Sequence, residues 1–261
     1  MTDQIADTDN MKTIVSKDNP TIRRCLALHS KKYRDRYGEF LVEGTKLVEE
    51  ALHLKRVRRL LVREDRAQTF AGRLADTVVM PAKLFEKIAD TETAQGVAAI
   101  VAKKDGPLMP QDQASCLLVL DRLQDPGNIG TIIRTAEAAG YGGVVAIKGT
   151  ADVYAPKVVR AAAGAILRIP VLYVEDEEEA AQYLAAMGKT IVCTALNAEA
   201  AFYEVDLHRS IALVIGNEGH GVSKKMQALS DKRIMIPMQG ETESLNAAVA
   251  AGILMYQKVI D

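Results

Sequence analysis

Apolar runs alternate with amphipathic segments along most of the chain. Short runs rich in Val, Ile and Leu predict strands, and apolar residues three or four positions apart predict helices. In the first part of the chain we predict strands at 39–43, 57–63, 78–80 and 96–101, a helix at 44–54 and a basic helix that starts at Asn19–Pro20. In the second part we predict strands at 117–120, 143–147, 169–173, 190–195, 211–215 and 233–236, and helices at 127–139, at 155–163, after the acidic run 175–179 and from 243. This alternation is typical of an α/β protein.

A break in the pattern separates the two parts. Residues 103–110 contain one glycine and two prolines, a composition typical of a linker. We predict an N-terminal domain at 1–107, a linker at 108–114 and a C-terminal domain at 115–261. The strand at 117–120 is apolar throughout, as expected in a parallel sheet that is covered on both faces. Roughly the first 11 residues are polar and are expected to be disordered.

Composition agrees with a folded protein and reveals an uneven distribution of charge. Of 261 residues, 48% are hydrophobic, which is enough to fill a core. The net charge is −1, yet residues 12–73 hold 16 Lys and Arg against 8 Asp and Glu, and the rest of the chain holds 17 against 26. A basic region of this kind indicates a polyanionic partner. Charged helix faces that are simply exposed to water are the alternative interpretation.

The three cysteines, Cys25, Cys116 and Cys193, are too few and too widely spaced for a disulfide framework or a Cys-x-x-Cys metal site. Cys116 and Cys193 lie in apolar runs and are interpreted as core residues. The acidic run 175–179 suits the start of a helix rather than a metal ion. No window reaches the roughly 18 to 20 apolar residues that a membrane-spanning helix needs. We therefore expect a cytoplasmic protein that binds neither a membrane nor a metal.

Polar residues gather at three junctions where a predicted strand passes into a helix. The junctions are 125–134, 215–223 and 234–246. The carboxyl ends of parallel strands meet at one edge of a sheet, so these loops are predicted to assemble one site there.

Each junction also has a purely structural interpretation. Arg134 lies on an otherwise apolar helix and needs an acceptor, which an ion pair would supply. The glycines of 216–221 fit a tight left-handed turn as well as a close approach of the backbone to a ligand. Ser244 and Asn246 are residue types that cap helices.

The common sequence signatures of nucleotide and hydrolase sites are missing. The chain contains no GxxxxGK[ST] loop, no GxSxG turn and no HExxH helix. The spacing of glycines in 216–221 does not fit GxGxxG, and the strand at 143–147 is followed by Lys148 and Gly149 rather than by an acid that would bind a ribose. An ordinary Rossmann dinucleotide or adenosylmethionine site is therefore disfavoured.

Taken in order, the three junctions resemble the three motifs of the SpoU (TrmH) family of RNA 2′-O-ribose methyltransferases, which belong to the SPOUT class. The segments that carry the resemblance are 128–136, 215–223 and 236–246, within a region from about Ser115 to Asp261. The N-terminal domain resembles the ribosomal-protein-like α/β domain that binds RNA in many members, through 39–44 and 95–97. The resemblance, rather than the periodicity, implies a parallel sheet with a trefoil knot. It also implies S-adenosylmethionine as methyl donor, no metal, and a homodimer with its site near the subunit interface.

The resemblance further implies roles for individual residues. Arg134 is the implied base for the ribose 2′-hydroxyl. Because arginine normally stays protonated, polarisation of the hydroxyl through a neighbouring phosphate is the alternative role. The other implied catalytic residues are Asn128, Glu218, Ser244 and Asn246. The implied contacts to S-adenosylmethionine are Thr194, Ala195, Leu196, Gly216, Asn217, Gly221, Ile236, Leu245 and Asn246. One departure from the family pattern is an alanine, Ala162 or Ala163, where serine is usual, which weakens any polar role there.

Structured RNA is the implied substrate, with 23S ribosomal RNA first and tRNA second. The predicted RNA contacts are Arg23, Arg24, Lys31, Lys32, Arg34 and Arg160. A non-catalytic RNA-binding or ribosome-assembly protein that retains the fold is the alternative from another functional class. The presence of Asn128, Arg134, Glu218, Ser244 and Asn246 favours the enzyme.

Overall fold

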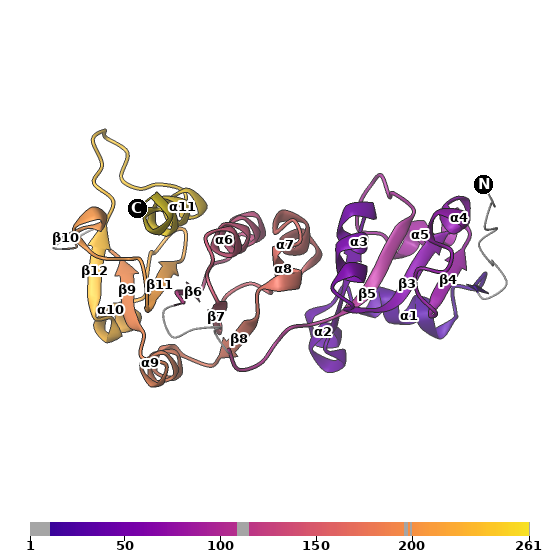
Figure 1. Cartoon of the computed structure of the whole chain (residues 1–261), viewed down its shortest axis with the longest axis horizontal. Coiled ribbons are helices and arrows are strands. Elements are labelled where there is room, and N and C mark those ends of the chain that lie inside the picture. Colours follow the sequence, from indigo (N-terminus) through magenta and orange to yellow (C-terminus); the bar gives the residue numbers. More distant parts are fainter. Residues whose placement is uncertain (1–10, 109–114, 196–197, 199, 261) are drawn as a thin grey trace, which may run out of the picture. The chain divides into compact units, whose positions relative to one another are not determined.

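The computed structural model describes residues 11–108, 115–195, 198 and 200–260 (Figure 1). Most of the predicted linker, the first ten residues and the predicted cofactor contact Leu196 lie outside the described residues. The chain divides into two compact units. Unit 1 consists of Met1–Lys103 with Tyr154–Arg160, and unit 2 consists of Lys104–Val153 with Ala161–Asp261.

Unit 1 is built on a five-stranded mixed sheet. The strand order is β1 (Lys12–Thr13), β4 (Thr77–Met80), β3 (Val57–Arg63), β5 (Val97–Ala102) and β2 (Glu39–Glu43). β5 runs antiparallel to both of its neighbours, and the other pairings are parallel. The helices are α1 (Pro20–Ala27), α2 (Lys31–Tyr37), α3 (Thr45–His53), α4 (Ala67–Phe70), α5 (Ala82–Ile88) and the 3-10 turn η2 (Glu64–Arg66). Most of α7 (Pro156–Ala161) also belongs to this unit.

Local sequence signals define the first helices. The side chain of Asn19 accepts a hydrogen bond from the Thr21 amide at 2.9 Å, and Pro20 occupies the first turn of α1, where its missing N–H costs nothing. Gly38 ends α2 in the left-handed region, with φ of 63°. Cys25 on α1 is fully buried, and this burial raises the pKa of its thiol to about 12.

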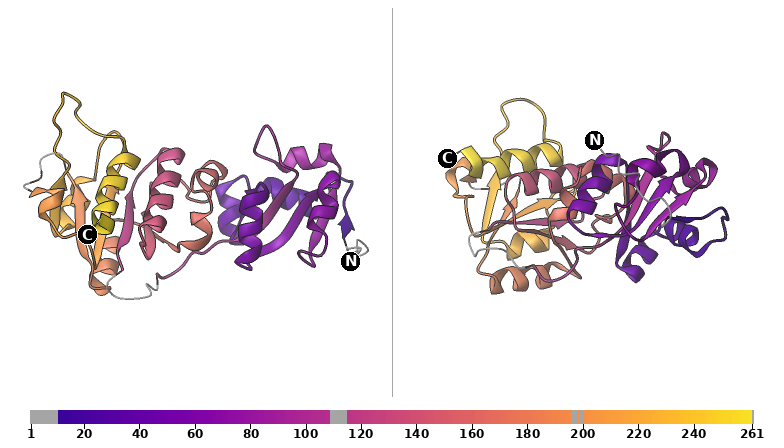
Figure 2. Two further views of the ribbon diagram at one scale, coloured as in Figure 1. Left: turned by 45° about the horizontal axis from the view of Figure 1, so that its top comes forward. Right: turned by 45° about the vertical axis from the view of Figure 1, so that its right-hand side comes forward.

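Unit 2 is built on a seven-stranded sheet in which every pairing is parallel. The strand order is β10 (Ala200–Ala201), β12 (Lys232–Met235), β9 (Thr190–Thr194), β11 (Ile211–Gly216), β6 (Leu117–Asp121), β7 (Gly143–Ile147) and β8 (Val171–Val174). Helices α6 (Pro126–Ala138), α8 (Ala165–Arg168) and α11 (Ala247–Ile260) cover one face (Figures 1 and 2). Helices α9 (Glu177–Ala186) and α10 (Lys224–Leu229) cover the other, and the 3-10 turn η3 spans Phe202–Glu204. The predicted parallel sheet is confirmed.

The direction of strand addition reverses at the centre of this sheet. From β6 the chain adds β7 and β8 on one side, and it then returns so that β9 and β11 lie on the other side of β6. Such a reversal opens a crevice at the carboxyl ends of the two central strands, where ligands of open α/β sheets bind. The junctions after β6 and β11 therefore lie where a site is expected.

Element boundaries follow the predictions closely except at the last helix. Every predicted strand is present to within two residues at each end. The last helix was predicted to start at Glu243, which is wrong, because α11 starts at Ala247. The Asn246 side chain accepts hydrogen bonds from the amides of Ala248 and Val249, at 2.9 and 3.3 Å, and so caps the helix. Ser244 lies in the loop before it. The pattern also missed the short elements α8, α10, η3, β1 and β10.

No helix within the described part of the chain is long and apolar enough to cross a membrane. The same residues include no group of three or more His, Cys, Asp or Glu side chains arranged to hold a metal ion.

Candidate active site

The junction between β6 and α6 places Asn128 on the first turn of a helix. The side chain of Asp125 accepts a hydrogen bond from the Asn128 amide at 2.7 Å, and Pro126 is the first helical residue. This cap ends the loop at Asp125. The half-buried Asn128 side chain is therefore held at the carboxyl edge of the sheet.

The junction after β11 is a tight turn that requires glycine. A Cβ atom on Gly216 would lie 2.1 Å from the Val222 nitrogen and 2.2 Å from the carbonyl carbon of Gly221. The backbones of Asn217 and Gly221 exchange hydrogen bonds of 3.0 and 2.8 Å, and Gly221 has φ of 67°. The turn alone explains Gly216 and Gly221. Its result is a loop that projects Glu218.

Glu218 joins the first two junctions. Its carboxylate accepts hydrogen bonds from the amides of Gln124 and Asp125, at 3.1 and 3.0 Å, and from Nδ2 of Asn128 at 3.2 Å. Partial burial acts to raise the pKa of this carboxyl, but hydrogen bonds from backbone amides and from Asn128 outweigh it. The pKa therefore lies below its ordinary value. Glu218 is thus an anion that fixes the β6–α6 loop.

Asn246 connects the third junction to the other two. Its Nδ2 donates a hydrogen bond to Oδ1 of Asn128 at 2.9 Å, while its Oδ1 caps α11. A continuous chain of hydrogen bonds therefore runs from Glu218 through Asn128 to Asn246. These three predicted site residues meet at one edge of the sheet, although Asn128 and Asn246 are 118 positions apart in the sequence.

Arg134 lies on α6 with its side chain exposed to solvent. Among the described residues it has no ion pair or hydrogen bond through its guanidinium. The nearby Glu137 is occupied instead by Arg168, whose Nε and Nη2 donate to it at 2.6 and 3.0 Å. The ion-pair interpretation of Arg134 therefore finds no support, and its guanidinium is available to a ligand.

The predicted cofactor contacts lie at the carboxyl ends of three neighbouring strands. Thr194 ends β9 and Ala195 follows it, Gly216 ends β11, and Ile236 follows β12. Asn217 is held by a hydrogen bond from its Nδ2 to the Arg122 carbonyl at 2.9 Å. Thr194, Ala195, Ile236 and Leu245 are half-buried, and Ser244 is exposed.

The loop 236–245 between β12 and α11 has unused backbone hydrogen-bonding capacity. Within the described residues, none of its polar groups makes a hydrogen bond. Asn246, directly after the loop, is by contrast bonded both to Asn128 and to the amide of Ala248. Figure 1 shows this loop extending away from the rest of unit 2. Backbone donors and acceptors that have no protein partner are free to bond a ligand.

A partly buried ionic network supports the β6–α6 loop, and the sequence did not reveal it. Arg122, which adopts φ of 58°, donates a hydrogen bond to the carboxylate of Glu177. Glu177 is buried, with only 3% of the residue's surface exposed. The Ser223 hydroxyl also donates to Glu177 at 3.0 Å, and its amide donates to Oδ2 of the buried Asp121 at 2.7 Å. Burial acts to raise the pKa of Glu177, but its hydrogen bonds, including those from Ser223 and Arg122, lower it below the ordinary value. Glu177, within the acidic run 175–179, thus stabilises the β6–α6 loop of the candidate site.

Comparison with known proteins fits this arrangement. Residues 115–256 match the model of the SpoU rRNA Methylase family, and residues 19–99 match that of the MRM3-like substrate binding domain. The chain belongs to the SpoU rRNA methylase family. The match with the substrate-binding domain covers most of the sheet and helices of unit 1.

Relatives and solved structures are similar over nearly the whole chain. The 23S rRNA (guanosine(2553)-2′-O)-methyltransferase RlmP of Bacillus subtilis is 37% identical over 94% of this chain and 98% of its own. The AdoMet-bound rRNA methyltransferase of Sinorhizobium meliloti superposes with a TM-score of 0.85 at 30% identity, over 95% of this chain and 97% of that one. The AdoMet complex of the SpoU methyltransferase AviRb of Streptomyces viridochromogenes gives 0.83 at 31% identity, over 92% and 97%.

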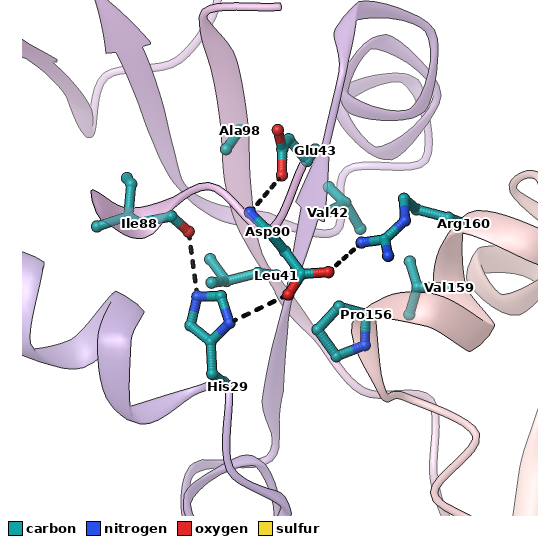
Figure 3. A pocket seen from close by; sticks show the side chains of 10 residues that line it. All are labelled: His29, Leu41, Val42, Glu43, Ile88, Asp90, Ala98, Pro156, Val159 and Arg160. Carbon is teal, nitrogen blue, oxygen red and sulfur yellow. Dashed lines mark hydrogen bonds and ion pairs between the residues drawn. The ribbon is translucent and has the colours of Figure 1, made fainter. Parts of the chain in front are cut away.

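The basic residues predicted to contact RNA differ in their surroundings. Arg34 is 3% exposed and donates to the Leu28 carbonyl at 2.6 Å, which argues against direct RNA contact and corrects the prediction for this residue. Arg160 is paired with Asp90, whose carboxylate also lies 3.8 Å from Nδ1 of His29; Figure 3 shows the three side chains pointing toward one another. Both arginines therefore have a structural partner that the sequence did not indicate.

The remaining predicted RNA contacts lie on α1 and α2. Arg23 pairs with Asp18 at 3.2 Å, Arg24 with Glu39 at 2.7 Å, and Lys31 with Asp35 at 2.7 Å. Lys32 is exposed and has no ion pair among the described residues.

Proposed function

We propose that the chain transfers a methyl group from S-adenosylmethionine to the 2′-hydroxyl of a ribose in 23S ribosomal RNA, in the cytoplasm. The observation that carries this proposal is the hydrogen-bonded chain of Glu218, Asn128 and Asn246 at the carboxyl edge of the sheet. Family membership and the 23S rRNA activity named for the Bacillus subtilis relative support it. We propose that 1–107 forms the RNA substrate-binding domain, 108–114 the linker and 115–261 the catalytic domain.

We propose that S-adenosylmethionine occupies the carboxyl ends of β9, β11 and β12, with Thr194, Ala195 and Ile236 as contacts. The half-buried apolar side chains there suit an adenosine, and the unbonded backbone of 236–245 suits its polar atoms. Gly216, Asn217, Gly221, Leu245 and Asn246, together with Leu196, complete the proposed set. The bound cofactor supplies an electrophilic methyl group. We further propose that the loop 236–245 is part of a trefoil knot.

Arg134 is the proposed residue that prepares the ribose hydroxyl. Its guanidinium is exposed and unpaired among the described residues, so it is free to bond the hydroxyl or an adjacent phosphate. A protonated guanidinium next to the hydroxyl oxygen stabilises the negative charge that develops there while the hydroxyl proton passes to water. Asn128 and Glu218 hold the first turn of α6, the helix that carries Arg134, and Ser244 and Asn246 border the same edge.

We also propose that the enzyme is a homodimer that pairs through α11. Val249, Ile253 and Tyr256 are spaced four and three residues apart, so they lie on one face of this helix. They are 53%, 37% and 38% exposed, which is unusual for three large apolar side chains in one row. Because α11 packs on α6, such an interface would lie near Arg134. Analytical ultracentrifugation of Ile253→Asp tests it, with a monomer as the expected result.

Ribose-methylation mapping of total RNA from cells with and without the gene tests the function directly. One 2′-O-methyl group in 23S rRNA is expected to disappear when the gene is deleted. Calorimetry with S-adenosylmethionine provides the second readout, because a non-catalytic member of the fold would bind RNA and give no heat with the donor. The proposal would be refuted if the methylation map were the same with and without the gene and the protein did not bind S-adenosylmethionine.

A further inference from the structure

The short helix α2 carries a pair of stacked tyrosine rings. Tyr33 and Tyr37 are four residues apart and therefore lie on the same face. Their ring centroids are 6.0 Å apart and the planes differ by 24°. Tyr37 also packs against the hydrophobic core of unit 1, which holds the pair in place. Both side chains are only half-buried, so part of each ring remains accessible.

Cations surround these rings. The Arg24 guanidinium lies 3.6 Å from the centroid of the Tyr37 ring, and that of Arg36 lies 5.8 Å from it. Nζ of Lys32 lies 5.7 Å from the Tyr33 centroid. Arg24 is also bonded to Glu39, through Nε and Nη2 at 3.0 and 2.7 Å, so it is a fixed part of the stack.

Lys32 and Arg36 differ from the other cations of this region. Both are exposed, and neither has an ion pair among the described residues. The single acid of α2, Asp35, is shared by Lys31 and Lys103, at 2.7 and 2.6 Å. Partial burial acts to raise the pKa of Asp35, but the hydrogen bonds from the two lysines lower it below the ordinary value. Asp35 therefore leaves the charges of Lys32 and Arg36 uncompensated.

Aromatic rings beside uncompensated cations fit one kind of ligand well. Unpaired bases of RNA stack on tyrosine rings and on guanidinium planes, and the phosphates that flank them bind lysine and arginine. In a continuous duplex the base faces are covered by their neighbours, so the rings would remain unused. The group formed by Lys32, Tyr33, Arg36 and Tyr37 is called the α2 surface below.

We propose that the α2 surface binds an unpaired nucleotide of the RNA substrate, with the base on the tyrosine rings and the phosphates on Lys32 and Arg36. This inference rests on the proposed function and deepens it, because it states which form of RNA unit 1 recognises. It also replaces the buried Arg34 with Arg36, which the sequence did not single out.

Fluorescence anisotropy with the full-length chain tests the stacking contact. The probes are a short single-stranded oligoribonucleotide of mixed sequence and a blunt-ended duplex of two complementary strands. Tyr33→Leu is expected to weaken binding of the single strand about tenfold and to change duplex binding less than about twofold, whereas Tyr33→Phe retains the ring and the affinity. Equal losses on both RNAs, or no loss on the single strand, overturn the inference.

Removal of the two exposed cations provides a test that does not depend on the core. The double variant Lys32→Ala/Arg36→Ala is expected to reduce the slope of log affinity against log salt by about 0.7 for each lost phosphate contact on single-stranded RNA. The matched control is Lys46→Ala/Lys83→Ala, which removes two exposed cations from α3 and α5. An equal fall in the control variant means that general positive charge, rather than the α2 surface, binds the RNA.

Methyl transfer to 23S rRNA separates this inference from the proposed function. The α2 variants are expected to raise KM for RNA about tenfold while kcat and donor affinity stay unchanged. Normal KM in these variants refutes the α2 surface and leaves the enzyme intact. Absence of methyl transfer by the unchanged chain refutes the function, while the two binding experiments still decide whether the α2 surface takes unpaired RNA.

Discussion

The two sides of the candidate site differ in how completely their polar groups are bonded. On one side, the loops that contain Glu218 and Asn128 are joined by hydrogen bonds from two backbone amides and from the Asn128 side chain to Glu218. The Arg122–Glu177 ion pair adds to the stability of this side. On the other side, the loop 236–245 makes no hydrogen bond to another described residue. Groups fixed before the substrate arrives stabilise developing charge without reorganisation, whereas an unbonded loop can close on a ligand. We infer that the first side serves the ribose and the second serves the methyl donor.

The strongest test of this division is removal of Arg134. Arg134→Ala is expected to lower methyl transfer by about a thousandfold or more, because α6 (Pro126–Ala138) itself carries no other cationic residue. The side chain is exposed and has no partner among the described residues, so the melting temperature and the affinity for S-adenosylmethionine should stay unchanged. Transfer of labelled methyl groups to 23S rRNA measures the first quantity and calorimetry the last. Full activity in this variant would refute the role of Arg134.

Substitution of one glycine by alanine on each side of the candidate site compares how rigid the two sides are. Gly216→Ala forces a Cβ to within 2.1 Å of the Val222 backbone and is expected to destabilise unit 2 by about 3 kcal/mol or more. Gly240→Ala in the unbonded loop meets nothing within 4 Å and is expected to be neutral. Thermal unfolding measures both. Equal melting temperatures for the two variants would show that the bonded side is not rigid.

Neutralising Glu218 is expected to weaken, but not abolish, the hydrogen bonds that hold the β6–α6 loop. Glu218→Gln keeps the shape but loses the charge that holds two backbone amides and Asn128, so kcat is expected to fall about tenfold. The matched control is Glu241→Gln, which removes an exposed charge from the loop 236–245 and should leave kcat unchanged. A larger loss at Glu241 than at Glu218 would contradict the proposed division.

The smallest expected effect is a pH dependence of stability. The pKa of Glu218 in the folded chain lies below the value of 4.5 for an unperturbed glutamate, so the folded state binds its proton less readily than the unfolded state. Its contribution is therefore complete above about pH 4.5 and is lost as the pH falls through the lower folded value. Unfolding of the wild type and of Glu218→Gln from pH 7 to pH 3 measures it. The difference between the two should shrink only in the acid range, and a constant difference would count against the charged role.

Sequence patterns predicted that the three junctions would meet because strand ends are local features. The apolar runs that form β6, β11 and β12 end next to clusters of polar residues, and parallel pairing then brings those ends to one edge. The start of α11 was misplaced because serine, glutamate and asparagine all suit the first turn of a helix. Only the hydrogen bonds from the amides of Ala248 and Val249 to Oδ1 of Asn246 show which residue is the cap.

The residues that sequence reasoning missed act over long separations. Arg122 and Glu177 are 55 positions apart, and nothing in the sequence of the acidic run 175–179 distinguishes the buried Glu177 from its more exposed neighbours. Arg34 and Arg36 belong to the same basic helix, yet one is buried and the other is exposed. A basic composition indicates a polyanionic partner, but only packing decides which cations remain free.

The amino-acid sequence by itself determined the alternation of strands and helices, the polar junctions and their similarity to SpoU methyltransferases, because each depends on neighbouring residues or on a short ordered motif. Tertiary structure alone decided that Asn128 bonds to both Glu218 and Asn246, and that Lys32 and Arg36 lie beside two rings without an ion pair to any described residue. The physical reason is that hydrogen bonding and burial depend on distances across the sheet and between helices, which the order of residues along the chain does not contain.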